Sequence, residues 1–455
     1  MLSFTDPSRF GRREFLRVGA ASLGGLALPH LGRAAGDSSH SEKSVVFLFL
    51  HGGPSQFETF DPKPDAPAEI RSATGHIPTA LPGVRFGASF PKLAALADRL
   101  AVVRSFVPGD GNHDIKPVVC KDTAGANLGS AFARMAGGNH PTTGMPRNVA
   151  LFPRAVDPSA GEEQRGFGNF LAPGPFGAVA APFAPGGTGP FQKNMKLALP
   201  TDRFDDRRAL LAHLDRLKES LDADQHAGHD TGRDQAYRML LGGVADAFDL
   251  GREDPKTVAR YDTAPLVRPD AIDKKWKNYN HYCDNAKTLG KLLLLARRLC
   301  ERGAGFVTVT TNFVWDMHAD VNNATMTEGM RYMAPPLDHA LSAFLEDLAA
   351  RGLSEKILLV CCGEMGRTPK INGKGGRDHW GNLGPLLLAG GGMNMGQVVG
   401  RSAANGGEPN SDPVTIRHLV GTVMNALFDV GKLRVVRGLS REIQQMAEGP
   451  VIPNL

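Results

Sequence analysis

The stretch KILLVCC at residues 356–362, with the segment GEMGRTPKINGKGGRDHWGN that follows it at residues 363–382, decides the fold class. KILLVCC is a short apolar run, which is typical of a buried β-strand. The segment after it carries Glu364, Arg367 and His379 among glycines. In open α/β sheets, ligands bind beyond the carboxyl ends of the strands, so charged groups directly after a buried strand indicate a ligand site there.

Strand-like apolar runs and amphipathic helical runs alternate along the chain. The predicted strands are residues 44–50, 100–106, 304–311, 356–362 and 384–392, and the predicted helices between the later strands are residues 285–303 and 333–352. Strands that alternate with helices at this spacing form a parallel sheet. The sequence therefore predicts an α/β fold, a doubly wound and mainly parallel sheet with helices on both faces.

The N-terminal segment has the features of an export signal. Arg12 and Arg13 precede Phe15 and a mild apolar stretch, and a small-x-small site ends at Ala34. Paired arginines in this setting are typical of the twin-arginine pathway, so residues 1–34 are predicted to be a signal peptide and the protein to be periplasmic or otherwise exported. The alternative is an uncleaved amphipathic arm. The apolar stretch is too short and too rich in glycine to span a membrane.

The rest of the chain is predicted to be one domain, residues 44–450. Within it, residues 141–283 are expected to form an insertion or cap, because residues 141–200 are rich in Gly and Pro and show little periodicity. The spacing of apolar residues predicts two amphipathic helices in this region, at residues 206–223 and 235–250.

Composition argues against some classes of function. The net charge is only +5, and no Lys/Arg tract or interleaved aromatic stripe points to nucleic acid. The five cysteines fit no zinc ribbon and no redox CxxC spacing. Structural thiols are the expected role of these cysteines, with a disulfide or a catalytic cysteine as alternatives.

Polar residues follow several predicted strands at the point where each strand ends. Burying such charges together is costly without compensation, which a divalent cation would supply. Imidazole with carboxylate suits zinc, manganese or iron, whereas oxygen ligands alone suit magnesium or calcium. We therefore predict a divalent metal, with zinc, manganese and calcium as the candidates. The predicted ligands are His51, Asp316, His318, Glu364, Asp378 and His379.

Two further residues are predicted to take part in the chemistry. His113 is expected to act as an acid/base group, because an imidazole has a pKa near neutrality, or to be a further metal ligand. Arg367 is expected to bind an anionic group through a bidentate contact, and Arg377 could bind such a group in the same way. The alternative for Arg367, and for Arg377, is an Arg–carboxylate clamp that only fixes the loop.

Several segments together resemble one bacterial family. They are RREFLRVGA at residues 12–20, FLHGGPSQFETFDPKP at 49–64, MPRNVALFP at 145–153, WDMH at 315–318 and, most specifically, residues 363–382. Over nearly its whole length the chain is similar to an exported family known as domain of unknown function fifteen-oh-one, often labelled sulfatase-like. The resemblance implies membership of the alkaline phosphatase superfamily, whose members share a doubly wound sheet and often a two-metal site.

The superfamily pattern transfers to this sequence only in part. Asp316 and His318 resemble a pair of metal ligands on a later strand, and His379 resembles the last metal-binding histidine. Relatives often have Asp where this chain has His51, and Glu364 stands where they have the aspartate of an Asp-His pair. The loop GDGNHDIKP at residues 109–117 lacks the Ser or Thr nucleophile of relatives, and no C-x-P-x-R signature is present.

Two functions of different classes follow from these features. The first is a metal-dependent hydrolase of phosphate or sulfate esters that forms no covalent Ser or Thr intermediate, since a metal ion can activate water directly. Its substrate would be an anionic small molecule or a glycan ester. The alternative is a non-catalytic envelope protein that keeps the fold and binds a ligand or a partner.

Overall fold

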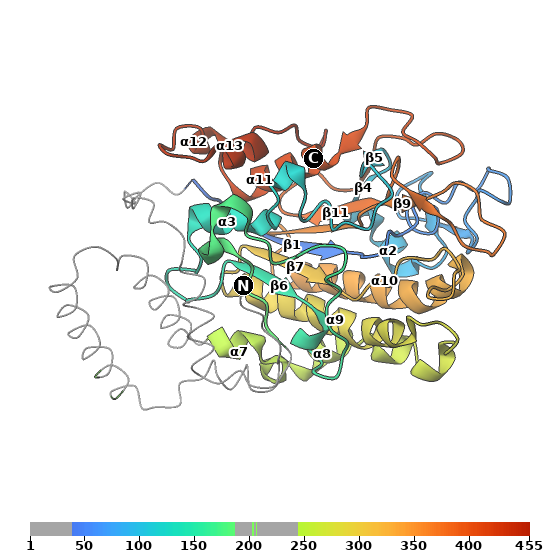
Figure 1. Cartoon of the computed structure of the whole chain (residues 1–455), viewed down its shortest axis with the longest axis horizontal. Coiled ribbons are helices and arrows are strands. Elements are labelled where there is room, and N and C mark those ends of the chain that lie inside the picture. The colour runs from blue at the N-terminus through green and yellow to red at the C-terminus, as the bar shows by residue number, and fades with distance from the viewer. Residues whose placement is uncertain (1–38, 187–202, 204–205, 207–243) are drawn as a thin grey trace.

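The computed structural model describes residues 39–186, 203, 206 and 244–455 (Figure 1). The predicted signal peptide and most of the predicted helices at residues 206–223 and 235–250 lie outside the described residues. Among the helices of the described chain, none combines the length and the apolar character needed to cross a membrane.

A seven-stranded sheet forms the centre of the described chain. Its strands, in the order in which they lie side by side, are β12 (Gln397–Val399), β4 (Ala101–Val103), β11 (Leu386–Gly390), β8 (Ile357–Cys362), β1 (Ser44–Phe49), β7 (Phe306–Thr310) and β6 (Asn148–Leu151). Strand β11 pairs antiparallel with β4 and β8, whereas the other pairs in this sheet are parallel. The predicted mainly parallel α/β sheet is confirmed, with one reversed strand.

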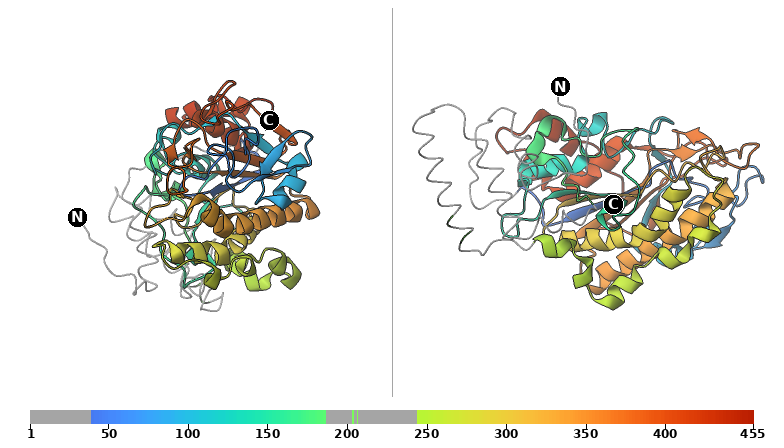
Figure 2. Two further views of the ribbon diagram at one scale, coloured as in Figure 1. Left: turned by 90° about the vertical axis from the view of Figure 1, so that its right-hand side faces the viewer. Right: turned by 60° about the horizontal axis from the view of Figure 1, so that its bottom comes forward.

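Helices cover both faces of this sheet (Figures 1 and 2). The helices α9 (Tyr279–Glu301) and α10 (Met326–Ala350) lie on one face, and α3 (Leu128–Ala136) and α11 (Ile416–Leu427) lie on the other. The described residues also form the α-helices α2 (Pro91–Ala95), α7 (Val244–Phe248), α8 (Pro255–Arg260), α12 (Val430–Leu433) and α13 (Arg441–Ala447).

Strand β1 shows why the sheet is covered on both sides. Val46 and Leu48 belong to the apolar core that includes α9 and α10, whereas Val45 and Phe47 belong to the core that includes α3 and α11. A strand that is buried on both faces reads as a continuous apolar run rather than as an alternating pattern. The run SVVFLFL at the start of the domain is therefore typical of a central strand.

In the part of the chain that the structure describes, three small two-stranded sheets accompany the main one. They are β2 (His76–Pro78) with β3 (Arg85–Gly87), β5 (Phe106–Val107) with β13 (Val414–Thr415), and β9 (Gly366–Arg367) with β10 (His379–Trp380). The strand predicted at residues 100–106 is thus divided. The Arg104 side chain donates to the carbonyl oxygens of Phe60 and Arg85 where β4 ends, and the chain then pairs with β13 instead of continuing along the main sheet.

Two sequence-based boundaries need correction. The region 141–283 is not a separate insertion throughout, because it supplies β6, which pairs with β7 inside the main sheet. Helix α10 begins at Met326, before the predicted start at residue 333, because the side chain of Thr325 accepts a hydrogen bond from the Glu328 N–H and caps the helix. The helix continues through Pro335 and Pro336.

Candidate metal centre

The reversed strand β11 brings a long segment back to the edge of the sheet where β1, β7 and β8 end. Leu386, the first residue of β11, lies opposite Cys362, the last residue of β8, so residues 363–385 leave and re-enter the sheet at this edge. Within that segment β9 pairs with β10, and this pairing places His379 opposite Arg367. Side chains that follow three different strands therefore meet at one edge, as predicted for ligand sites in such sheets.

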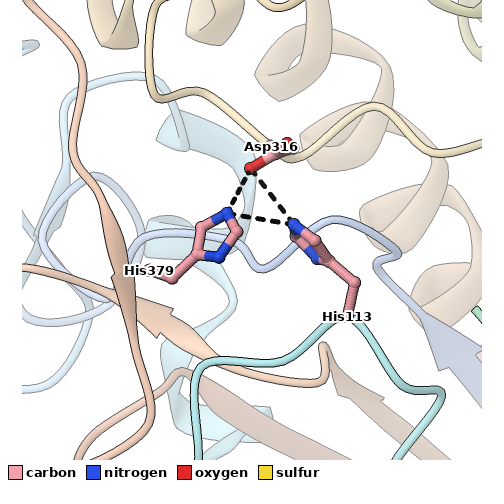
Figure 3. A group of neighbouring side chains, drawn as sticks. All are labelled: His113, Asp316 and His379. Atoms are coloured by element: carbon pink, nitrogen blue, oxygen red, sulfur yellow. Dashed lines mark hydrogen bonds and ion pairs between the residues drawn. The ribbon is translucent and has the colours of Figure 1, made fainter.

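Three of these side chains point toward one another (Figure 3). His379 Nε2 lies 3.1 Å from Asp316 Oδ1 and 3.0 Å from His113 Nε2, and His113 Nε2 lies 3.5 Å from the same Asp316 oxygen. Two ligands of a tetrahedral ion lie about 3.4 Å apart when each metal–ligand bond is about 2.1 Å. The three donor atoms thus have the spacing of neighbouring ligands around one ion. We call His113, Asp316 and His379 the central cluster.

Glu364 fixes the orientation of His113. The carboxylate of Glu364 is fully buried, and its Oε1 lies 2.8 Å from His113 Nδ1. The Gly52 N–H donates to the same carboxylate at 2.9 and 3.2 Å. Because a carboxylate accepts, the proton on Nδ1 is held by Glu364, and Nε2 is directed at the other two members of the cluster. A carboxylate behind a histidine in this way is typical of histidines that bind metals.

Asp316 connects the cluster to its surroundings. Its Oδ2 lies 2.9 Å from His318 Nε2 and accepts a hydrogen bond from Asn323 Nδ2 at 3.0 Å. Burial acts to raise the pKa of Asp316, but hydrogen bonds from His113, His318 and His379 outweigh burial and hold the pKa well below its usual range. Asp316 is therefore a carboxylate, which is the form that binds a cation.

The two carboxylates also act on the neighbouring imidazoles. Burial opposes protonation of His113, yet hydrogen bonds to Asp316 and Glu364 prevail and raise its pKa. The hydrogen bond to Asp316 likewise raises the pKa of His318. The same negative field that favours a proton on these rings favours a metal cation between them.

The structure corrects the role predicted for Arg367. Its guanidinium is fully buried and lies 2.8 Å from Asp316 Oδ1. Its other N–H groups donate to the backbone carbonyl oxygens of Gly52, Gly53, Trp315 and Arg377. Because these groups are already engaged with the protein, Arg367 is a clamp that joins the turns after β1 and β7, and it is not placed to bind a substrate anion.

Arg377 is a second clamp of the same kind. Its guanidinium is fully buried, lies 3.3 Å from the equally buried Glu58 carboxylate, and stacks on the Phe57 ring. It also donates to the carbonyl oxygens of Thr368, Pro369, Ile70 and Arg71. The sequence offered Arg377 as a candidate clamp but gave no signal that its partner would be Glu58, more than 300 residues away.

The other predicted ligands lie outside the central cluster. His318 contacts Asp316 at Oδ2, the oxygen that does not face the other two members of the cluster. Glu364 contacts His113 at Nδ1, on the side of the ring away from His379. Asp378 is exposed, and its carboxylate accepts a hydrogen bond from Asn372 at 3.0 Å. Of the six predicted ligands, the structure therefore brings Asp316 and His379 together, and it adds His113, which we predicted as an acid/base group or a ligand.

His51 lies beneath the cluster in an aromatic environment. Its ring packs edge-on against Phe167, Phe170 and Phe313, and its imidazole hydrogen-bonds the backbone of His113. Burial lowers the pKa of His51, so this ring is neutral. Its Nε2 is buried and has no hydrogen-bond partner among the described residues. His51 supports the loop that carries His113 and does not join the three converging donors.

Residues that the sequence analysis missed include Gly52 and Asn323. Gly52 has φ +116°, and a Cβ at this position would lie 2.6 Å from the Asp316 backbone nitrogen. Only glycine lets the turn after β1 lie so close to the turn after β7. The Gly-Gly pair after a predicted strand was a usable signal for this contact. Asn323 lies in a polar loop, and no feature of the sequence indicated that its side chain would contact Asp316.

Three solved structures are similar to the chain at low sequence identity. The lipoteichoic acid synthase LtaP from Listeria monocytogenes has 10% identity and a TM-score of 0.33, with 95% of this chain and 82% of that chain covered. The PsFucS1 sulfatase from Pseudoalteromonas sp. has 11% identity and a TM-score of 0.37, with 91% and 72% covered. The phosphonate monoester hydrolase SpPMH from Silicibacter pomeroyi has 10% identity and a TM-score of 0.34, with 84% and 73% covered.

The sequence itself gives the firmer assignment. No curated protein matches the chain. The family model described as "Protein of unknown function (DUF1501)" matches residues 42–452, which is nearly the whole chain and includes every residue of the central cluster. The chain belongs to the DUF1501 family of proteins of unknown function.

Proposed function

We propose that the protein is a metal-dependent hydrolase of phosphate or sulfate esters. The observation that carries the proposal is the convergence of His113 Nε2, Asp316 Oδ1 and His379 Nε2 within 4.8 Å of one another. Glu364 Oε1 lies 2.8 Å from His113 Nδ1, so Nδ1 is engaged and Nε2 is the nitrogen left to bind a metal. A sulfatase-like resemblance of the family motifs supports the substrate class, an anionic small molecule or glycan ester.

The donor set indicates which metal would bind. Two imidazole nitrogens and one carboxylate oxygen suit zinc or manganese, whereas calcium prefers a shell of oxygen ligands. His113, Asp316 and His379 would hold the ion. When bound, such a cation acts as a Lewis acid on an ester oxygen and lowers the pKa of water. His318 Nε2 lies 2.9 Å from Asp316 Oδ2 and its side chain is one-quarter exposed, so it can exchange a proton with solvent beside the central cluster.

We infer that hydrolysis proceeds without a covalent enzyme intermediate. Among the described residues, no Ser or Thr hydroxyl forms a hydrogen bond to a member of the central cluster. With the zinc- or manganese-loaded protein, p-nitrophenyl phosphate, bis-p-nitrophenyl phosphate and p-nitrophenyl sulfate test the three ester types. His113→Ala should lower the rate by about 10²-fold or more, as for other lost acid/base or ligand groups.

Two outcomes of that assay would contradict the proposal. Inactivity of the metal-loaded wild type on all three esters argues against the hydrolase. A phosphorylated or sulfated Ser or Thr, trapped by rapid acid quench and found by mass spectrometry, would overturn the mechanism. Asp378→Ala is the matched control, because Asp378 is exposed and lies outside the central cluster. This variant should keep wild-type activity.

We further propose that the protein is exported by the twin-arginine pathway. The support is the Arg12-Arg13 pair in front of a mild apolar stretch. Replacing both arginines, Arg12→Lys with Arg13→Lys, should leave the protein in the cytoplasm, as measured by cell fractionation and immunoblotting. Unchanged delivery of the double variant to the cell envelope would reject the proposed signal.

One observation favours a non-catalytic binding protein as the second candidate. Arg367 already lies 2.8 Å from Asp316 Oδ1, so this oxygen has a cationic partner without any metal. In that case the central cluster would be a hydrogen-bonded network that fixes the loops of a ligand-binding surface. Metal content separates the two functions, because the hydrolase requires bound metal and the binding protein does not.

A further inference from the structure

The loop that carries His113 lies at the surface without regular structure. Residues 108–114 follow β5 and contain no helix or strand. At one end of the loop, the Gly109 N–H donates to the Gly381 carbonyl at 3.0 Å. Within the loop, the Asn112 N–H donates to the Asp110 side chain at 2.9 Å. A loop with so few backbone hydrogen bonds needs side-chain contacts to hold His113 at a fixed distance from Asp316 and His379.

Lys116 supplies such contacts from inside the protein. Its side chain is 6% exposed, and its Nζ lies 2.6 Å from Asp110 Oδ1 and 2.6 Å from Asp114 Oδ1. The same ammonium donates to the Asn112 carbonyl at 3.1 Å. The three acceptors occupy the three donors that a lysine ammonium has. Asp114 is the neighbour of His113 on one side, and Asn112 is its neighbour on the other.

This arrangement constrains His113 more than an ordinary surface ion pair would. Surface pairs are weak because both side chains are mobile and solvated, but here the cation is buried and fixed. One ammonium gathers three oxygens that span five residues of chain, from Asp110 to Asp114. The loop is thereby folded around the cation, and His113 projects from the bend toward Glu364 and His379.

We propose that Lys116 is a positioning residue for His113, acting through the bend of residues 110–114 rather than by touching the ion or the substrate. The expected effect, tighter metal binding by the central cluster, rests on the proposed function. Lys116 itself contacts no member of the central cluster in the described chain.

Lys116→Met in the full chain tests the proposal. Methionine keeps an apolar side chain at this buried position, and the two carboxylates that lose their partner are each more than half exposed, so water can solvate them. The fold should therefore survive. Lys121→Met is the matched control, because Lys121 is exposed and lies in the same connection. Zinc affinity is measured by competition with a chromophoric chelator, and hydrogen–deuterium exchange is measured on peptides that cover residues 108–117.

The expected result is a 10- to 100-fold weaker zinc affinity in Lys116→Met, the range typical of groups that orient metal-binding histidines. Amide exchange should become faster in residues 110–114 and stay unchanged elsewhere. Lys121→Met should match the wild type in both measurements.

The two measurements separate failure of this inference from failure of the proposed function. Faster loop exchange with unchanged zinc affinity would overturn the positioning role. Unchanged loop exchange in Lys116→Met would also overturn it, whatever the zinc result. A wild type that binds no zinc or manganese would instead remove the proposed function. In that case exchange in the metal-free protein would still decide whether Lys116 holds the loop.

Discussion

Asp316→Ala should both abolish metal binding and destabilise the folded protein by about 3–5 kcal/mol, the usual cost of leaving a buried charge without its partner. The Asp316 carboxylate touches all three neighbouring imidazoles and the Arg367 guanidinium. Its removal leaves Arg367 fully buried, with backbone carbonyls as its only acceptors among the described residues. Urea denaturation gives the change in unfolding free energy, and elemental analysis gives the metal content.

Asp378→Ala is the control for this prediction. Asp378 lies in the same segment between β8 and β11 as Glu364 but is exposed, and its carboxylate accepts a hydrogen bond from the Asn372 side chain. Surface substitutions of this kind usually change stability by about 0.5 kcal/mol or less. If Asp316→Ala has the metal content of the wild type, Asp316 is not a metal ligand. If Asp316→Ala and Asp378→Ala lose the same amount of metal, Asp378 belongs to the metal site as well.

Gly52→Ala should have the second largest effect on the unfolding free energy, after Asp316→Ala. The new Cβ would lie within 3 Å of three backbone atoms of Trp315 and Asp316, which cannot rotate away as a side chain can. The turn after β7 would have to move, and Asp316 would move with it. We expect a loss of several kcal/mol in unfolding free energy, above the roughly 1–2 kcal/mol that the positive φ alone costs, together with weaker metal binding.

Gly83→Ala separates the clash from the backbone strain. Gly83 also has a positive φ, +77°, but a Cβ there would meet nothing within 4 Å. In this variant, backbone strain alone should lower the unfolding free energy, by about 1–2 kcal/mol, and the metal should stay bound. Equal losses in Gly52→Ala and Gly83→Ala, measured by the same urea titration, would show that the close approach of the two turns is unimportant.

The main sheet could be predicted because its central strands are buried on both faces. Strands such as β1 and β8 read as unbroken apolar runs, and the helices α9 and α10 carry long periodic apolar stripes. Strand β6 was missed because it is four residues long and lies in a Gly/Pro-rich region, where local composition favours loops. The three-residue strand β12 offered too little sequence for any period to be seen.

The candidate site could be predicted as a region but not as a set of contacts. Parallel topology sends the carboxyl ends of β1, β7 and β8 to one edge, so residues that follow them must come together. Topology does not say which oxygen or nitrogen faces the centre. Arg367 and Asp378 show the difference, since both lie in the predicted segment, yet one is buried as a clamp and the other points to solvent.

Elemental analysis of the purified protein, after exposure to zinc or manganese and removal of free ion, shows whether the central cluster binds a metal. The wild type should carry about one equivalent per chain, and the double variant His113→Ala with His379→Ala should carry less than about one-tenth, because two of three ligands are gone. Circular dichroism confirms that the double variant is folded. A folded double variant with the metal content of the wild type, or a wild type that retains no metal, would show that the central cluster is not a metal site.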